Sequence, residues 1–178
     1  MAEGKLTQGG ERYAFRDVTA RDASLLKRWL EQPHWREWWG DPDDALTEIL
    51  NHVESVETEP LIVELGGRPL AYLQVYDPHL EDDHPYQDQP FGTLGLDVAI
   101  GPAEMLGRGH GPALLAQFCG TLFDEGCPRV IIDPDPANLR AIRAYEKAGF
   151  KIFDHRSSIY GPAVMMAREP ELREAELD

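Results

Sequence analysis

The sequence predicts a single α/β domain built on a mixed sheet that contains a parallel strand–helix–strand unit. The length of 178 residues and a hydrophobic content of 42% suit one domain with one sizeable core. Segment 93–133 changes from strand to helix to strand character, and two strands joined by a crossover helix run parallel. Two pairs of strand-like segments flank short glycine-containing turns, which is typical of antiparallel hairpins. The parallel unit therefore lies inside a sheet that also holds antiparallel strands.

The first half of the chain predicts one strand, two helices and a hairpin. Thr19 and Asp22 resemble a capping box, and the apolar residues that follow share one helical face. Pro42 favours the start of a second helix, and the Trp-rich segment before it, 32–43, is expected to be a loop. The remaining expected elements are a strand at Tyr13–Val18 and a hairpin of Leu61–Leu65 with Leu70–Tyr76.

The second half predicts the parallel unit, a further helix and a last hairpin. Gly149 directly follows the further helix and suits the left-handed conformation that often ends helices. We expect one domain over residues 1–178, with its core at about 13–168 and loose tails at 1–11 and 170–178. The expected elements are strands at Thr93–Ile100 and Arg129–Asp133, helices at Gly109–Phe123 and Asn138–Ala148, and a hairpin of Lys151–Ser158 with Ala163–Arg168.

Charge and hydropathy narrow the possible partners. The formal net charge is −15, from 32 Asp plus Glu against 17 Lys plus Arg, and nucleic-acid partners require basic surfaces instead. No apolar run is long enough to span a membrane and the first residues lack the apolar core of a signal peptide, so we expect a cytoplasmic protein without a membrane partner. Segment 77–88 holds five acids and no Lys or Arg, which favours a cationic small molecule as the partner.

The cysteines and histidines predict neither a disulfide framework nor a metal centre. Cys119 and Cys127 are the two cysteines, and Cys119 falls on the apolar face of a predicted helix, where we expect a buried, inert thiol. His79 and His84 lie among acids without a recognised ligand spacing, so no metal is expected.

A glycine-rich loop, Leu106–Gly111 (LGRGHG), follows a predicted strand and opens a helix. Glycines at alternate positions let the bare backbone approach a phosphate, and the N–H groups of the first helical turn then point at the anion. No Lys-Ser/Thr follows, and the spacing differs from the dinucleotide-binding fingerprint, so the loop matches neither common phosphate motif. A flexible strand-to-helix turn would explain the same glycines.

A second motif favours the binding interpretation. It runs from Asn138 to Phe150 after a short strand, and Asn138, Ala141 and Tyr145 share one helical face. The small Ala141 lets a ligand lie against the helix, and Tyr145 would hold a hydroxyl over that ligand. A core tyrosine is the alternative role for Tyr145.

The two motifs together resemble the GNAT superfamily of acyl-CoA N-acetyltransferases. The segments WLEQPHWREWWG, LAYLQVY, TLGLDVAIG, DPDPANLRAIRAYEKAGF and YGPAVMM occur in the order typical of aminoglycoside 6'-N-acetyltransferases, over roughly residues 13–168. Leu106 departs from the Gln or Arg that the family places at the head of the glycine loop, and Tyr160 stands where the resistance enzymes tend to have an acid. The resemblance implies a GNAT fold with a mostly antiparallel sheet and flanking helices, and acetyl-CoA as the acyl donor.

The resemblance also implies a mechanism and the residues that carry it. Asp97 stands at the position of the carboxylate that takes a proton from the substrate amine, although it could instead only bind the ammonium group. Tyr145 would return a proton to the departing thiolate. The implied cofactor-binding residues are Val98, Ile100, Gly107, Arg108, Gly109, His110, Gly111, Pro112, Asn138, Ala141 and Tyr145.

The substrate implied by the resemblance is a polycationic amine, and its contacts are acids and aromatic residues. Asp133 ends a buried strand, and strand ends of this kind face ligand crevices. Asp82 and Asp83 are alternative candidates for another ammonium contact. The implied substrate-binding residues are Trp38, Trp39, Asp82, Asp83, Asp97 and Asp133.

Two other functions are weighed against aminoglycoside acetylation. A hydroxylysine N-acyltransferase of siderophore synthesis would be expected to carry a His-bearing strand motif near Asp97, and the sequence there is TLGLD. A non-catalytic acyl-CoA-binding module would need neither Asp97 nor Tyr145, and both are present. We therefore expect an N-acetyltransferase that acts on the 6'-amine of an aminoglycoside.

Overall fold

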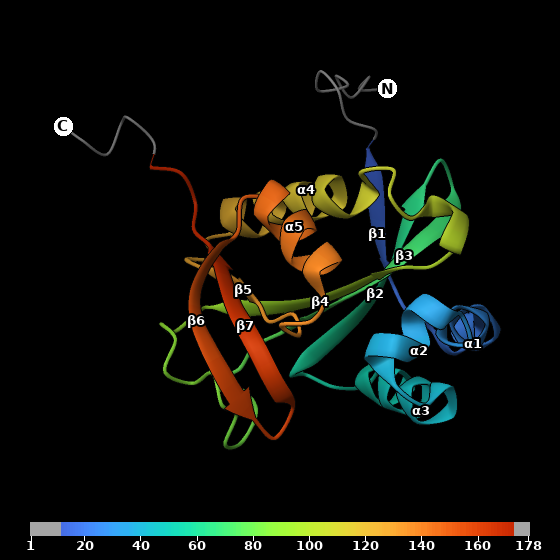
Figure 1. Cartoon of the computed structure of the whole chain (residues 1–178), viewed down its shortest axis with the longest axis horizontal. Coiled ribbons are helices and arrows are strands. Elements are labelled where there is room, and N and C mark those ends of the chain that lie inside the picture. Colours follow the sequence, from blue (N-terminus) through green and yellow to red (C-terminus); the bar gives the residue numbers. More distant parts are fainter. Residues whose placement is uncertain (1–11, 173–178) are drawn as a thin grey trace.

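The computed structural model describes residues 12–172 and contains a seven-stranded sheet with helices on both faces (Figure 1). The strand order is β1-β2-β3-β4-β5-β7-β6, in which β4 and β5 are parallel and the other neighbours antiparallel. The predicted mixed, mostly antiparallel sheet with a parallel βαβ unit is therefore confirmed. The tails predicted at 1–11 and over most of 170–178 lie outside the described residues.

The strands agree closely with the segments that the sequence predicts. The hairpin of β2 and β3 turns at Gly66-Gly67, where both glycines have positive φ. The last hairpin turns one residue earlier than expected, because β7 already begins at Gly161. The strands are β1 (Tyr13–Asp17), β2 (Thr58–Leu65), β3 (Arg68–Tyr76), β4 (Leu94–Ile100), β5 (Val130–Ile132), β6 (Lys151–Ser158) and β7 (Gly161–Arg168).

The helices agree with prediction except in the Trp-rich segment. That segment was expected to be a loop and instead holds the helix α2, which starts with Pro33 at its first turn and buries Trp35. The capping box at Thr19 and Asp22 is present and leads into α1. The helices are α1 (Ala23–Leu30), α2 (Pro33–Trp39), α3 (Pro42–His52), α4 (His110–Asp124) and α5 (Leu139–Lys147), and no helix within residues 12–172 is long and apolar enough to cross a membrane.

Side chains alternate between the two faces of the sheet and build two cores. On one face, Leu96 and Val130 pack against the apolar side of α4, with Leu115 and Phe118 among the contacts. On the other face, Ile62 and Tyr72 pack against α1, α2 and α3. The loop of residues 77–93 covers the part of this second face that the helices leave free, where its Tyr86 joins Tyr76 and Ile131. An open region between α2, α3 and this loop remains over the middle of the sheet.

Candidate active site

The two parallel strands separate in the middle of the sheet, and the candidate site forms at this split. β4 and β5 pair only at Leu94↔Val130 and Gly95↔Ile131. If that register continued, Asp97 would lie opposite Asp133, on the same face of the sheet. The strands diverge before this point, so the two carboxylates flank the split. Asp97 and Asp133, which were both predicted to belong to the site, are therefore neighbours.

A cavity of about 520 Å³ opens at the split, between α2 and α3, the loop 77–93 and the last hairpin. Its lining includes six carboxylates and no Lys or Arg, so it has a strongly negative potential. Of the predicted site residues, Trp38, Trp39, Asp97, Val98, Asp133, Asn138 and Tyr145 line this cavity. The carboxylates are those of Glu37, Glu48, Glu81, Asp97, Asp133 and Asp135.

Asp97 is held by a neighbour on β3 that the sequence did not single out. Gln74 lies directly opposite Asp97 in the β3–β4 pair, and its Nε2 donates a hydrogen bond of 2.9 Å to Asp97 Oδ2. The Tyr72 hydroxyl donates to Gln74 Oε1 over 2.6 Å. Burial, then repulsion from Asp133, raises the pKa of Asp97 to about 7, although the Gln74 hydrogen bond lowers it. A polar residue within the apolar segment LAYLQVY was the available signal for Gln74.

Asp133 is held by a residue of the loop 77–93. Tyr86 is almost fully buried, and its hydroxyl donates a 2.5 Å hydrogen bond to Asp133 Oδ2. Burial raises the pKa of Asp133 above its ordinary value, and the Tyr86 hydrogen bond partly opposes this rise. No pattern in the sequence indicated Tyr86, because its contact with Asp133 depends on how the loop folds.

Helix α5 brings Asn138 and Tyr145 to the cavity. Asn138 is the N-cap of α5, and its side-chain oxygen accepts from the N–H of Ala141 over 3.2 Å. Tyr145 lies two turns further along. Burial, followed by the charges of Asp97 and Asp133, raises the pKa of the Tyr145 hydroxyl above its ordinary value. The hydroxyl therefore keeps its proton at neutral pH.

The open edge of β4 supplies backbone donors at the split. N–H groups alternate in direction along a strand, and those of Leu94 and Gly101 bond to opposite neighbours. By this alternation the N–H of Val98 points toward the side of β5, beyond the two paired residues. At the end of the strand, the carbonyl of Ile100 accepts from the side chains of His34 and Trp35. Val98 thus has a donor free for a ligand in the split.

The glycine loop precedes α4 and has the geometry of an anion-binding turn. Gly107 and Gly109 have φ of +72° and +82°, which favours glycine. Gly109 is the N-cap of α4, whose first turn receives no side-chain cap, and a Cβ at Gly109 or Gly111 would meet nothing within 4 Å. The N–H donors of this helix end are thus accessible to an anion.

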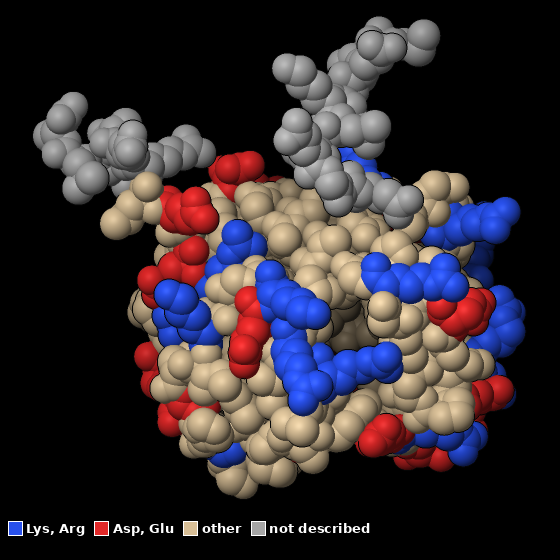
Figure 2. All heavy atoms as spheres, turned by 45° about the horizontal axis from the view of Figure 1, so that its top comes forward, with Lys and Arg blue, Asp and Glu red and all other residues tan. Residues whose placement is uncertain are grey.

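Cationic side chains surround the glycine loop. Figure 2 shows Lys and Arg gathered around a hollow on the face that carries α4 and α5. Arg140, at the start of α5, has Nη2 3.5 Å from the position that a Cβ on Gly107 would take. Arg108 is exposed in the same loop. His110 has a different role, because its Nδ1 is 2.8 Å from the Tyr13 hydroxyl. The glycine loop is therefore flanked by cationic side chains that suit an anionic ligand.

The two predicted tryptophans differ in their surroundings. Trp39 packs on Trp35 and Tyr72, with ring centroids 5.3 and 5.6 Å apart, so it belongs partly to the core. Trp38 is 38% exposed and also lines the cavity. Trp38 is therefore the freer of the two to contact a ligand.

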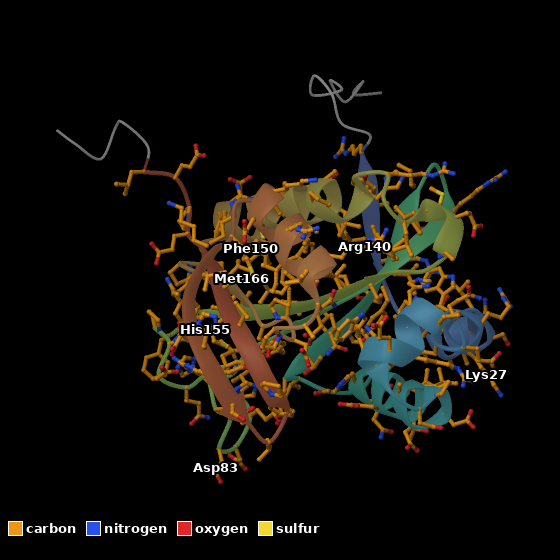
Figure 3. The ribbon with its side chains drawn as sticks, viewed as in Figure 1. Lys27, Asp83, Arg140, Phe150, His155 and Met166 are labelled. Carbon is orange, nitrogen blue, oxygen red and sulfur yellow. The ribbon has the colours of Figure 1, made fainter. Side chains whose placement is uncertain are left out.

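The loop 77–93, the acidic loop, contributes an acid to the cavity lining, but not one of the two that were predicted. Asp82 and Asp83 are exposed and do not line the cavity, and Figure 3 shows Asp83 at the outer tip of the loop. Glu81 lines it instead. Tyr160, where the resemblance expects an acid, also lines the cavity and donates to Glu81 Oε1 over 3.2 Å.

The remaining predicted features concern a cysteine, a turn and the expected absence of a metal. Cys119 is fully buried, and burial raises the pKa of its thiol to about 12, which keeps the thiol protonated. Asp135 accepts from the N–H of Ala137 over 2.8 Å and shapes the turn before α5. Within residues 12–172, no group of three or more His, Cys, Asp or Glu side chains is arranged to hold a metal.

Comparisons with known proteins find acetyltransferases and other acyltransferases among the proteins similar to this chain. A family model described as an acetyltransferase (GNAT) domain matches residues 18–157. The aminoglycoside N(6')-acetyltransferase type 1 of Klebsiella pneumoniae is 33% identical over 172 residues, which cover 92% of this chain and 86% of that protein. The lysine N-acyltransferase MbtK of Mycobacterium tuberculosis is 32% identical over 147 residues, covering 78% of this chain and 69% of that protein. The crystal structure of aminoglycoside acetyltransferase AAC(6')-Ib with coenzyme A and kanamycin aligns with a TM-score of 0.81 at 33% identity, covering 89% of this chain and 95% of that one.

Proposed function

This chain belongs to the GNAT acetyltransferase family, and we propose that it transfers the acetyl group of acetyl-CoA to the 6'-amine of an aminoglycoside. The observation that carries this proposal is the cavity at the β4–β5 split, which is lined by six carboxylates and by no Lys or Arg. A cavity of this charge attracts polycations, and aminoglycosides carry several ammonium groups. The similarity to aminoglycoside acetyltransferases over most of both chains supports the same substrate class.

Acetyl-CoA, when bound, supplies the acetyl group as an activated thioester. We infer that the glycine loop and the start of α4 hold its pyrophosphate, with Arg108 and Arg140 as cationic neighbours. The N–H of Val98 would bind the acyl oxygen. The side-chain amide of Asn138 and the small side chain of Ala141 would line the path along α5. Of the other predicted cofactor contacts, Ile100 lies at the end of β4, and His110 and Pro112 lie in the first turn of α4.

Asp97 would act as the general base. Only the free amine has a lone pair that can attack a thioester, so a proton must leave the substrate ammonium group. A pKa of about 7 makes Asp97 a base that is matched to neutral pH. Gln74 occupies Oδ2, which leaves Oδ1 for the substrate. Tyr145 holds a proton on its hydroxyl and would give it to the leaving sulfur, and Asp133 would bind the substrate by charge.

The lysine N-acyltransferase relatives point to an alternative that the cavity disfavours. Lysine and hydroxylysine carry an α-carboxylate as well as an amine, and a lining with six carboxylates and no Lys or Arg repels a carboxylate. The test is thiol release from acetyl-CoA and from longer acyl-CoA donors, with kanamycin, spermidine or hydroxylysine as the acceptor. We expect kanamycin with acetyl-CoA to be the best pair and mass spectrometry with NMR to place one acetyl group on the 6'-nitrogen. Preference for hydroxylysine with a long-chain donor would reject the proposal. Binding of acetyl-CoA without thiol release for any of the acceptors would instead indicate a non-catalytic binding module.

The same activity predicts a role in antibiotic resistance. Acetylation removes one positive charge from the drug at neutral pH, which weakens its binding to anionic targets. We propose that expression of this chain in a susceptible bacterium raises the inhibitory concentration of kanamycin, and that the Asp97→Asn variant does not. Equal inhibitory concentrations with and without the active chain would reject this role.

A further inference from the structure

Glu81 and Tyr160 meet at the mouth of the cavity, although they come from distant parts of the chain. The Tyr160 hydroxyl donates to Glu81 Oε1 over 3.2 Å. Glu81 belongs to the acidic loop, and Tyr160 lies in the turn between β6 and β7. A second tie, the bidentate pair of Arg156 and Asp88 at 2.6 and 2.9 Å, joins β6 to the same loop. The Tyr160 hydroxyl therefore holds the Glu81 carboxylate, and the Arg156–Asp88 pair holds the loop that carries it.

Within the part of the chain that the structure describes, no Lys or Arg pairs with the negative charge of Glu81. Among residues 12–172, the one ion-pair partner of Glu81 is His84, whose Nε2 lies 3.8 Å from Oε2. Burial lowers the pKa of His84 below its ordinary value, so its ring is neutral at pH 7. The Glu81 side chain is 37% exposed and lines the cavity, which leaves it accessible to a ligand.

Two aromatic side chains adjoin this carboxylate: the Tyr160 hydroxyl donates to it, and His84 Nε2 lies 3.8 Å from it. The His84 ring lies 5.9 Å from the Tyr160 ring and 5.0 Å from the Tyr86 ring. Ring faces attract cations, and a neutral His84 does not repel them. A partly exposed carboxylate beside aromatic rings is a suitable environment for an ammonium group, and Asp97 and Asp133 lie separately at the β4–β5 split.

We propose that Glu81 binds a second ammonium group of the substrate while the amine to be acetylated lies at Asp97, and that Tyr160 is the positioning residue that orients Glu81. This inference rests on the proposed function and narrows its substrates to amines that carry at least two ammonium groups. Where the resemblance expects an acid, this chain has Tyr160. Its hydroxyl holds the carboxylate of Glu81 in place, and Glu81 supplies the negative charge.

The test compares Glu81→Gln with Asp82→Asn, since each removes one charge from the same loop but only Glu81 lines the cavity. For kanamycin, we expect Glu81→Gln to raise KM by roughly 3- to 10-fold with kcat largely kept, because a partly exposed ion pair is lost. Asp82→Asn should have a smaller effect. For a monoamine acceptor such as 6-amino-6-deoxyglucose, Glu81→Gln should leave KM within about twofold.

Tyr160→Phe keeps the ring and removes the hydroxyl, so it isolates the positioning role. We expect it to raise the kanamycin KM less than Glu81→Gln does, and to add nothing in the double variant, because both changes break one contact. Equal effects of Glu81→Gln and Asp82→Asn would overturn the inference, since they would indicate only the general field of the loop. Calorimetry measures kanamycin binding to wild type and to each variant. If wild type binds kanamycin but does not acetylate it, the proposed function fails. If wild type acetylates kanamycin and the two variants bind it equally well, only the role of Glu81 fails.

Discussion

Gln74 and Asp97 form a cross-strand pair in which Gln74 Nε2 donates a 2.9 Å hydrogen bond to Asp97 Oδ2. The Tyr72 hydroxyl fixes the amide of Gln74 by donating to its oxygen, so the NH₂ group faces the carboxylate. One oxygen of Asp97 is therefore held by the sheet, and the other is left for the substrate. The same hydrogen bond stabilises the charged form of a carboxylate that burial would otherwise neutralise.

The first prediction concerns the pH profile of Gln74→Leu. Removing the hydrogen bond raises the pKa of Asp97 above about 7, because the anion loses a donor while burial and Asp133 remain. A base is active when deprotonated, so the acid limb of kcat/KM should move to higher pH by about one to two units. The measurement is kcat/KM for kanamycin between pH 5.5 and 9. Tyr72→Phe should move the limb in the same direction by less, and an unmoved limb in both variants would show that Gln74 does not influence the base.

The second prediction concerns the stability of the ligand-free protein. The folded state binds a proton on Asp97 more tightly than the unfolded state, because the pKa of Asp97 is raised from 3.8 to about 7. Its contribution to stability is therefore complete below pH 4 and is lost as pH rises toward 7. Asp97→Asn avoids this loss, so at pH 8 it should unfold several degrees above wild type, and at pH 4 the difference should vanish. Thermal scans at both pH values measure this, and a lower Tm for the variant at pH 8 would contradict it.

The parts of the site that depend on local sequence could be predicted, and those that depend on tertiary contacts could not. The glycine loop and the face of α5 follow from spacing along one element, whereas the roles expected for Asp97 and Asp133 were implied by the resemblance to the GNAT superfamily. Gln74 reaches Asp97 only through the β3–β4 register, which the sequence does not state. Tyr86 and Glu81 depend on the path of an irregular loop.

The helix α2 shows the same limit at the level of secondary structure. Its seven residues, PHWREWW, are too few for a clear helical period, and Pro33 and Gly40 at its ends are also typical of loops. What stabilises the helix is burial of Trp35 against Trp29 and Tyr72, and its indole N–H donates to the carbonyl of Ile100. The contacts with Tyr72 and Ile100 are long-range, so the propensity of the segment alone did not indicate them.

The third prediction concerns the phosphate cradle and uses two glycines with different backbones. Gly109→Val should strongly raise the KM for acetyl-CoA, because its φ of +82° strains any side chain and the site of the anion is filled. Gly111 lacks a positive φ, and a Cβ there meets no protein atom within 4 Å, so Gly111→Ala separates strain from occlusion. We expect Gly111→Ala to keep or raise Tm and still raise the KM for acetyl-CoA. Unchanged cofactor affinity in both folded variants would place the pyrophosphate elsewhere.

The fourth prediction concerns Tyr145, whose alternative role is packing beside Phe150. Tyr145→Phe keeps the ring and removes the proton that the hydroxyl would give to the leaving sulfur. A general acid contributes roughly 10²- to 10⁴-fold, so kcat should fall by a large factor while KM changes little. The variant is measured where chemistry limits turnover, which a solvent-viscosity series can establish. A kcat within twofold of wild type would leave Tyr145 as a packing residue.

The last prediction separates catalysis from charge at Asp97. Asp97→Asn keeps the size and the hydrogen-bonding oxygen of the side chain but removes its charge and basicity. If Asp97 accepts the proton, kcat/KM for kanamycin at neutral pH falls by roughly 10²- to 10⁴-fold, and the loss shrinks as pH rises because free amine becomes abundant. If Asp97 only binds the ammonium group, KM rises and kcat is largely kept.

Asp133→Asn is the matched comparison, because Asp133 lies across the split and is assigned binding alone. It should raise the kanamycin KM at every pH and leave kcat close to wild type. It should also lower the pKa of Asp97, since repulsion from Asp133 is one cause of the raised value, and so move the acid limb of the profile to lower pH. The experiment is a pH–rate series on wild type and both variants at saturating acetyl-CoA. If both variants raise KM equally and without pH dependence, Asp97 is part of an acidic binding wall and the proton leaves by another route.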